Sequence, residues 1–381
     1  MEITLQKTFT FILFIGIGLL LKLKFDGKNE ISGIKKIILN LALPATIFIA
    51  LLGIKIDASL LLLPVMALVL NGILFFGFPL LLPLLGIYRN SPKYRTAKML
   101  IPSLAPGLSC FPFILEYLGD GYLAKAAMAD LGNKVFVLMI LYLVAMNWHY
   151  KLQSQVVRSQ ASKLKSLFIA MISEPVNLFI AAALILLGFG LNIDSLPFVI
   201  SDTLLRLSTL MTPLVLLFIG LAVKIRRKQF TQILSILLLR AGVVVLACTA
   251  FVYIFNVSVQ NDILLMLAFG LSACSFWPFA HISAVGSQEE DLADGQKTFD
   301  GTFSINILAL SFPLSTALIL GVLSSGNTFY GILPLLILSG VLLFLGFIPV
   351  IFLKAQEFRL ESARENKEVA QYEASSATEG A

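Results

Sequence analysis

The pattern of apolar and polar positions divides the chain into long apolar stretches separated by short polar ones. Most of the apolar stretches are about 17 to 25 residues long, which is enough for a helix to cross the hydrocarbon core of a bilayer. We therefore expect an all-α, multi-pass integral membrane protein. The pattern predicts eleven spans, over residues 9–23, 37–54, 59–86, 97–118, 122–148, 174–191, 204–223, 231–256, 262–285, 299–323 and 330–353.

The fourth predicted span contains prolines that a straight helix would not tolerate. Pro102, Pro106 and Pro112 all lie within residues 101–119. Proline removes a backbone donor and clashes with the preceding turn. In lipid, the backbone groups that it leaves free must be satisfied by protein or by a water-lined cavity. This span is therefore predicted to be a discontinuous helix.

The ninth predicted span repeats this feature in the second half of the chain. When Ser109 and Pro112 are aligned with Ser275 and Pro278, the phenylalanine after each proline also coincides. Two interrupted apolar segments at corresponding positions of two halves point to the binding site of a secondary transporter. We predict that spans 4 and 9 cross at a substrate site.

Basic residues are distributed unevenly between the two sides that these spans define. With the N-terminus outside, 22 of the 28 Lys and Arg residues lie on the inside and four lie on the outside. Positive charge accumulates on the cytoplasmic side of membrane proteins. The distribution predicts an outside N-terminus and a cytoplasmic C-terminus, and it explains a pI near 9.1 without nucleic acid as a partner.

The polar segment after the fifth span divides the chain into two halves of opposite topology. Five spans precede it, so the second half starts inside whereas the first started outside, as in inverted-repeat transporters. The predicted parts are a first repeat (1–148), a cytoplasmic loop (149–173), a second repeat (174–325), an appended eleventh span (326–353) and a cytoplasmic tail (354–381).

Span 5 carries ionisable residues near its centre. An ionised side chain there costs about 2.5–3.5 kcal/mol on insertion scales, so it should pair or line a cavity. Asp130 and Lys134 are four residues apart and could pair on one helix face, next to Asn133. The pair could be structural, or it could exchange partners when substrate or a proton binds. Both readings are open at this point.

The prolines of spans 4 and 9 suggest what such a site would bind. A broken helix exposes N–H groups and a positive dipole end, which favour a carboxylate. Ser109, Cys110 and Ser275 lie beside the prolines, and Trp277 could stack on a flat substrate or simply pack. We therefore expect a small organic anion, although a proline can also merely kink a packed helix.

Other polar residues within the spans have less specific interpretations. His281 could take up a proton or be simply hydrogen-bonded. Arg240 could snorkel or pair with an acid, and Asn40 and Asn306 could bond across helices. The acidic loop around Glu289 is expected to be solvated. The residues predicted to contact substrate are Asn40, Ser109, Cys110, Pro112, Asn133, Ser275, Trp277, Pro278 and Asn306, and those predicted to balance charge or couple an ion are Asp130, Lys134 and His281.

Several short motifs resemble the auxin efflux carrier family of permeases. Residues 40–45, Asn-Leu-Ala-Leu-Pro-Ala, are similar to that family's second span, and residues 126–133 resemble its Asp-x-x-Asn helix. Residues 212–221 and Arg240 resemble its seventh and eighth spans, so the similarity covers about residues 1–325. The chain differs from the family pattern in span 4, which has no asparagine, and at Trp277.

The resemblance implies a fold shared with bile-acid/sodium symporters. In that fold spans 1, 2, 6 and 7 form a scaffold, and spans 3–5 and 8–10 move. It also implies a homodimer and substrates such as auxin in plants or malate- and malonate-like dicarboxylates in bacteria. For this chain it suggests a bacterial plasma membrane.

The sequence contains no motif of an enzyme or of an ATP-driven pump. It has no Walker loop and no Cys or His spacing typical of a metal site, so we expect no cofactor. The leading hypothesis is a secondary transporter of small organic anions that works by alternating access. The alternatives are a sodium-coupled symporter or cation/proton antiporter on the same fold, with Asp130 binding the ion, and a membrane sensor that binds a ligand without transporting it.

Overall fold

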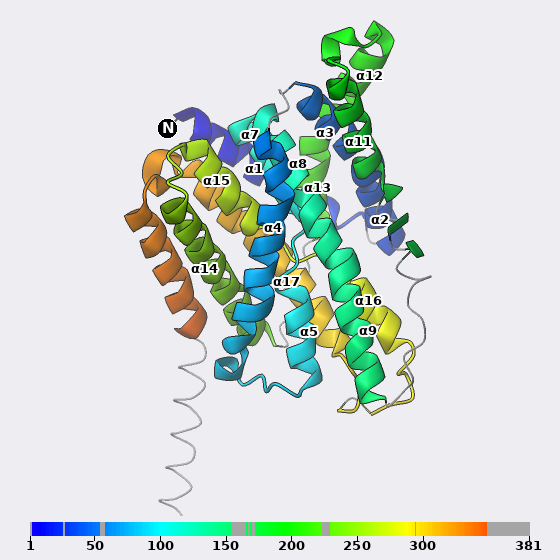
Figure 1. The fold of residues 1–381 in the computed structure, drawn as a ribbon, viewed down its shortest axis with the longest axis vertical. Coiled ribbons are helices and arrows are strands. Elements are labelled where there is room, and N and C mark those ends of the chain that lie inside the picture. The colour runs from blue at the N-terminus through cyan, green and yellow to red at the C-terminus, as the bar shows by residue number, and fades with distance from the viewer. Residues whose placement is uncertain are drawn as a thin grey trace, which may run out of the picture.

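The computed structural model describes residues 2–25, 27–53, 58–153, 165–166, 168–169, 172–222, 229–293 and 295–348, and all its regular elements are helices (Figure 1). In the first half these are α1 (Glu2–Leu21), α2 (Lys28–Ile37), α3 (Leu43–Leu52), α4 (Ala58–Gly77), α5 (Pro92–Leu100), α6 (Pro106–Ser109), α7 (Phe111–Leu118), α8 (Asp120–Val135) and α9 (Leu141–Leu152). In the second half they are α11 (Pro175–Gly188), α12 (Phe198–Thr209), α13 (Met211–Ala222), α14 (Phe230–Ile254), α15 (Gln260–Gly270), α16 (Phe276–Gly286), α17 (Gly301–Ser324) and a final helix, Ile332–Ile348.

Short π-helical and 3₁₀ segments join some of these helices. The π-helical segments are Ile38–Ala42 and Phe136–Ile140, and the 3₁₀ segments are Phe78–Leu80, Leu82–Leu85, Ile193–Ser195 and Gly326–Phe329. Through Phe136–Ile140, α8 and α9 form one continuous helix, Asp120–Leu152. Lys134 in α8 and the end of α9 therefore belong to the same rod.

The described helices are those of a polytopic membrane protein. Six are long and apolar enough to cross a membrane, and three shorter helices are also apolar. Each of the eleven predicted spans overlaps a helix or consecutive helices, although residues 54, 223 and 349–353, at the ends of three spans, lie outside the described residues. The predicted tail, 354–381, and most of the predicted loop, 149–173, lie outside the described residues.

The outer surface of the bundle is apolar, as lipid-facing helices require. Large apolar side chains such as Leu13 on α1, Leu61 on α4 and Phe198 on α12 are exposed. A soluble protein rarely leaves such contiguous apolar surface in contact with water. A helix that is hydrophobic all round is instead typical of a membrane span.

The fourth and ninth predicted spans are interrupted in the middle of the bundle. The first is divided into α5, α6 and α7, and the second into α15 and α16. In Figure 1, α5 and α16 lie in the lower half of the molecule, and α7 and α15 lie in the upper half. Pro106 begins α6 and Pro112 lies in the first turn of α7, where the missing N–H has no helical partner to lose.

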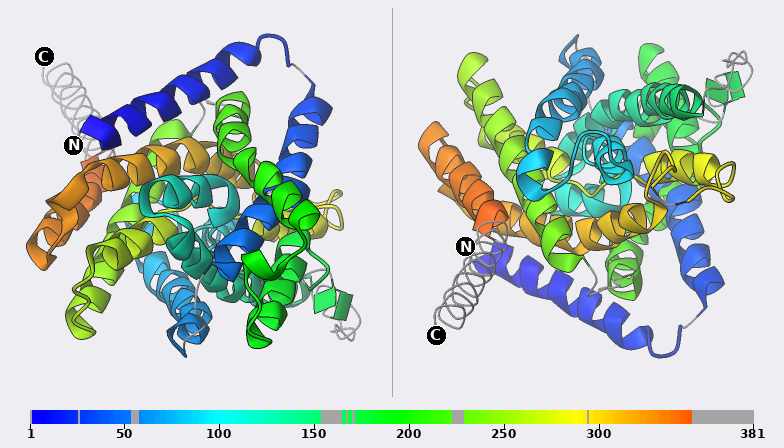
Figure 2. Two further views of the ribbon diagram at one scale, coloured as in Figure 1. Left: turned by 90° about the horizontal axis from the view of Figure 1, so that it is seen from above. Right: turned by 90° about the horizontal axis from the view of Figure 1, so that it is seen from below.

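Most of the closely packed helix pairs fall into two sets, which also contact each other where α3 packs on α8. In the first set, α1 packs along α13, and α11 and α12 pack on α3. In the second set, α4 packs on α8, α14 on α15, and α16 on α9 and α17. Figure 2 shows α1 at the periphery and the cyan to teal segments, α5 to α8, in the middle of the bundle. The first interrupted segment therefore lies in its interior.

Glycines allow the closest of these approaches. A Cβ atom on Gly18 would overlap the backbone of Leu217, and one on Gly220 would overlap the backbone of Ile15. These two glycines therefore let α1 and α13 touch backbone to backbone. Gly132, the residue before Asn133, likewise lets α8 touch the backbone of α4 at Pro64.

Candidate functional site

The two interruptions bind each other in the core of the protein. We call residues 101–105 and 271–275 the paired breaks. The amide N–H of Ala105 donates to the carbonyl oxygen of Ala273 across them, at 2.8 Å. Backbone groups released from helical bonding must find protein partners in such an apolar interior, and this bond satisfies one group on each side.

Serine hydroxyls supply further bonds between the two segments. Ser103 Oγ accepts from the amide of Ser275 at 2.9 Å, and Ser109 Oγ accepts from the amide of Ala273 at 3.0 Å. Each hydroxyl also donates to a carbonyl on its own segment. The predicted residues Ser109 and Ser275 are thus brought together, while Ser103 was missed by the sequence reasoning because no motif marks it.

Arg240 of α14 donates hydrogen bonds to the first break. Its Nε donates to the carbonyl of Ile101 at 2.8 Å, and its Nη2 donates to the carbonyl of Ser103 at 3.2 Å. The side chain is only 2% exposed. The expectation that Arg240 would snorkel or pair with an acid is therefore wrong. Its N–H groups donate instead to backbone carbonyls of the first break, which have no helical donor among the described residues.

Asn133 of α8 holds the first break from another side. Its Nδ2 donates to the carbonyl of Leu104 at 2.9 Å, and its Oδ1 accepts from the amide of Leu104 at 3.2 Å. Nδ2 also donates to Asp130 at 2.8 Å, and Oδ1 accepts from Asn71 of α4 at 3.2 Å. A single buried amide thus joins α4, α8 and the break.

Lys134 of α8 forms a buried network with two acids. Its Nζ lies 3.6 Å from Asp130 on the same helix and 3.1 Å from Glu174, which precedes the first residue of α11. It also donates to Asn177 Oδ1 at 2.8 Å. We call Asp130, Asn133, Lys134, Glu174 and Asn177 the charged cluster. The predicted contact between Asp130 and Lys134 is present. Glu174 and Asn177 were not predicted because they lie some forty residues away in the sequence.

Three buried polar atoms near these segments have no hydrogen-bond partner among the described residues. They are Ser272 Oγ in the second break, Asn71 Oδ1 beside Asn133, and Asn306 Oδ1 in α17. Five residues after Asn306, the hydroxyl of Ser311 accepts from the amide of Cys274 in the same break. Buried polar groups nearly always have a partner, so these atoms could bind a polar ligand or water.

Cys110, Pro112 and Pro278, three of the residues predicted to contact substrate, are buried beside the breaks. Cys110 precedes α7, and both prolines lie in the first turn of a helix. Trp277 is 38% exposed, so it does not pack in the core. Asn40 lies exposed on the π-helical segment that precedes α3.

His281, the remaining predicted residue, lies in α16. Its Nε2 is 3.0 Å from the carbonyl oxygen of Val137, and its ring packs edge-on against Tyr142. Val137 follows α8 by two residues, so this contact joins α16 to the long helix that carries the charged cluster. The bond to a backbone carbonyl agrees with the simpler of the two predicted roles for His281.

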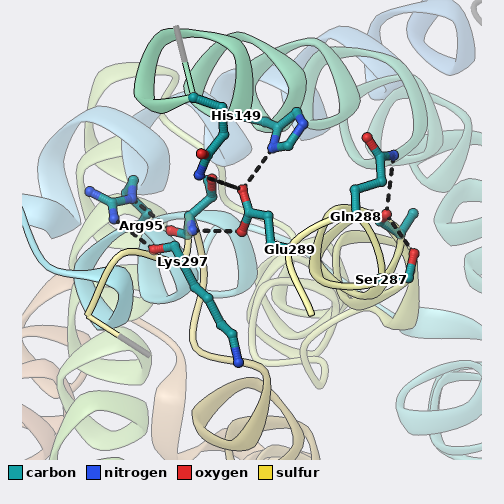
Figure 3. Close-up of polar contacts among 9 residues, drawn as sticks. Arg95, His149, Ser287, Gln288, Glu289 and Lys297 are labelled. Carbon is teal, nitrogen blue, oxygen red and sulfur yellow. Dashed lines mark hydrogen bonds and ion pairs between the residues drawn. The ribbon is translucent and has the colours of Figure 1, made fainter. Parts of the chain in front are cut away.

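A second polar cluster lies where the loop after α16 meets α9. Glu289 is 2% exposed, and it accepts from the amide of Thr298 at 2.8 Å and from the hydroxyl of Thr298 at 2.5 Å (Figure 3). His149 Nδ1 lies 2.7 Å from the same carboxylate, and Arg95 Nε donates to the Thr298 carbonyl at 2.7 Å. The expectation of a solvated loop is therefore wrong for Glu289.

The pKa of Glu289 lies below its usual value. Burial acts to raise this pKa, but hydrogen bonds from the Thr298 hydroxyl, the Thr298 amide and His149 outweigh that effect. The hydrogen bonds of this loop therefore stabilise the ionised form of the Glu289 carboxylate.

A cavity of about 570 Å³ lies between α1, α7, α12 and α13. Lys7, Glu116, Thr10 and Thr212 are among the polar residues that line it. Lys7 also donates to the backbone carbonyl of Glu116 at 2.5 Å. The cavity therefore lies between helices of the first set and α7, which follows the first break.

In comparisons with known proteins, no family model matches the chain, and no curated protein is significantly similar to it. The resemblance to auxin efflux carriers therefore stays a prediction that rests on the motifs quoted above.

Proposed function

We propose that this protein is a secondary transporter of small organic anions that works by alternating access at the paired breaks. The observation that carries the proposal is that the two interrupted segments bind each other in the core, next to buried polar atoms that have no hydrogen-bond partner among the described residues. Interrupted helices of this kind form the substrate sites of many secondary transporters. We further propose that the two halves are inverted five-helix repeats and that the two broken spans cross here.

The direction of the helices favours an anion. α16 begins directly after the second break, so its positive dipole end points toward the paired breaks, and α7 begins beyond α6 on the C-terminal side of the first break. Arg240 adds a buried guanidinium to the same region. Backbone N–H groups at a helix N-terminus readily bind a carboxylate, and a small mono- or dicarboxylate fits this arrangement.

The packing supports a movement of one helix set against the other. The set containing α1, α3 and α11–α13 corresponds to the scaffold that the resemblance implies, and the set containing α4, α8 and α14–α17 corresponds to the moving part. The cavity lies between helices of the first set and α7, which follows the first break, and this position suits an access path.

The charged cluster bears on the choice of coupling ion. Asp130 already receives the ammonium of Lys134 and the amide of Asn133. A sodium ion at Asp130 would have to displace the lysine, so this geometry favours proton coupling or exchange over a sodium site. The sodium-coupled symporter remains the second candidate, since in the described part of the chain Asn71 Oδ1 and Ser272 Oγ are oxygen atoms without a hydrogen-bond partner.

The test is uptake of labelled malate, malonate and indole carboxylate into proteoliposomes under sodium or pH gradients. Ser272→Ala removes a hydroxyl that has no partner among the described residues, so we expect a higher KM without loss of stability. Ser304→Ala is the matched control, because the hydrogen bond that this buried hydroxyl makes within the described structure is to the carbonyl of Gly301 in its own first turn. Uptake that requires a sodium gradient would favour the sodium-coupled symporter over proton coupling or exchange. A folded protein that moves no anion under any gradient would contradict the proposal and favour a sensor.

A further inference from the structure

Lys134 is shared between two carboxylates that belong to different helices. Asp130 is on the same helix as Lys134, four residues away, so the two always move together. Glu174 is the residue that precedes α11, and it reaches Lys134 only because α11 lies against this part of the protein. The ammonium lies closer to Glu174, at 3.1 Å, than to Asp130, at 3.6 Å. In this conformation the bond between helices is therefore the shorter one.

Asn177 strengthens the side of the network that belongs to α11. It accepts from Lys134 Nζ at 2.8 Å and donates to Glu174 Oε2 at 3.3 Å. Glu174 and Asn177 are three residues apart and face the same ammonium. Together they form a receptor for Lys134 at the start of α11.

The burial of the partners determines what happens when α8 and α11 separate. The side chains of Lys134 and Asp130 are each 9% exposed, whereas that of Glu174 is 26% exposed. A buried ammonium that loses every partner is strongly destabilised. Lys134 can avoid this by moving fully onto Asp130, and Glu174 can be hydrated. Lys134 can therefore be paired in two ways: with Glu174 when the two helices are together, and with Asp130 alone when they are apart.

We propose that Glu174 and Asn177 are positioning residues of the transport cycle. They dock Lys134 in one conformation and release it in the other, while Asp130 holds the ammonium after release. This inference rests on the proposed function, because it requires the helix set that contains α8 to move against the set that contains α11. It differs from a static ion pair in one respect: the two carboxylates compete for a single ammonium.

Competition predicts opposite effects of removing the two acids. Glu174→Gln weakens docking, so the population in which α8 and α11 are apart should rise. Asp130→Asn removes the alternative partner, so the docked population should rise. A purely structural network would respond in the same direction to both changes, because either one would loosen it.

The measurement is a distance distribution between two spin labels in lipid bilayers. Leu143→Cys on α9 and Leu178→Cys on α11 provide exposed positions, with the three native cysteines replaced by alanine. We expect two distances, with a population ratio that changes at least about fivefold in opposite directions for the two variants, as a coupling free energy of ordinary size requires. The Glu174→Asp variant keeps the carboxylate, so its population ratio should be close to that of the unsubstituted protein.

The controls separate misfolding and failure of the proposed function from failure of this inference. Arg206→Gln alters an exposed ion pair on α12 and should leave the ratio unchanged. Thermal unfolding of each variant identifies any that is misfolded, and the Glu174→Asp variant then provides the comparison. The labels report movement without any substrate, so opposite shifts support the inference even if none of the three anions is transported. A single distance in all proteins, or shifts in the same direction, would overturn it.

Discussion

The side-chain amide of Asn133 bonds to both backbone polar groups of Leu104, at 2.9 Å to the carbonyl oxygen and 3.2 Å to the amide nitrogen. An amide side chain offers a donor and an acceptor side by side, so it reproduces the pairing that a neighbouring strand or helix turn would otherwise provide. This relationship explains how the chain stays unwound at 101–105 inside an apolar bundle. It also links the break directly to the charged cluster through Asp130.

Replacing Asn133 with leucine should destabilise the protein markedly. The change leaves both polar groups of Leu104 buried without a partner, and each such group costs about 1–3 kcal/mol. We expect the midpoint of thermal unfolding in detergent to fall by several degrees. Asn71→Leu is the matched control, because it removes only one bond to Asn133 and should have a smaller effect. Equal midpoints for the Asn133 variant and the unsubstituted protein would show that the break is held by other contacts.

Arg240→Lys should also impair the protein, although the charge is kept. The guanidinium reaches the carbonyls of Ile101 and Ser103 with two separate N–H groups, and a single ammonium nitrogen on a flexible stem cannot reproduce this planar fork. We expect faster hydrogen exchange of the amides in 101–110 and lower uptake. Arg206→Lys, on the exposed face of α12, should change neither. Unchanged exchange in the Arg240 variant would argue against its role at the first break.

The sequence predicted the positions of the breaks but not what holds them. Proline acts locally through its ring and its missing N–H, so Pro106 and Pro112 mark the interruption without any knowledge of the fold. The contact between Asp130 and Lys134 was likewise predictable from helical spacing. Ser103 and Glu174 were not, because their partners lie on distant segments of the chain. Burial of Glu289 reversed the expectation of a solvated loop, since hydrogen bonds from Thr298 and His149 depend on tertiary packing.

Glu289 should stabilise the protein in a pH-dependent way. Its pKa is lower in the folded protein than its usual value of about 4.3. A lowered pKa means that the unfolded chain binds the proton more tightly, so the stabilisation is fully present above the unfolded pKa and is lost as pH falls through the folded one. Glu289→Gln should therefore lower the unfolding midpoint at pH 6 to 8.

The difference between the two proteins should shrink as the pH falls from the usual glutamate pKa of about 4.3 through the lower pKa of the folded protein, because the carboxylate is then protonated in both states. His149 and Arg95 are the basic groups nearest this cluster, so Glu290→Gln, an exposed neighbour in the same loop, provides the control for a change in overall charge. Its unfolding midpoint should follow that of the unsubstituted protein throughout. A Glu289→Gln effect that grows as the pH falls would contradict the assignment.

Adding a methyl group at the contact between α1 and α13 should separate these helices. The Cβ atom of Gly220→Ala would overlap the backbone of Ile15, and that of Gly18→Ala would overlap the backbone of Leu217. Backbone atoms cannot move aside as a flexible side chain can, so we expect each variant to lose about 1–3 kcal/mol through overpacking. Gly16→Ala lies on the same helix with nothing within 4 Å of its added carbon, and it should be neutral or slightly stabilising because alanine favours helix. Thermal unfolding of the three variants checks the prediction. Equal midpoints for Gly16→Ala and Gly18→Ala would mean that α1 and α13 do not pack backbone to backbone in the folded protein, and the first helix set would then lack the close contact on which a rigid scaffold depends.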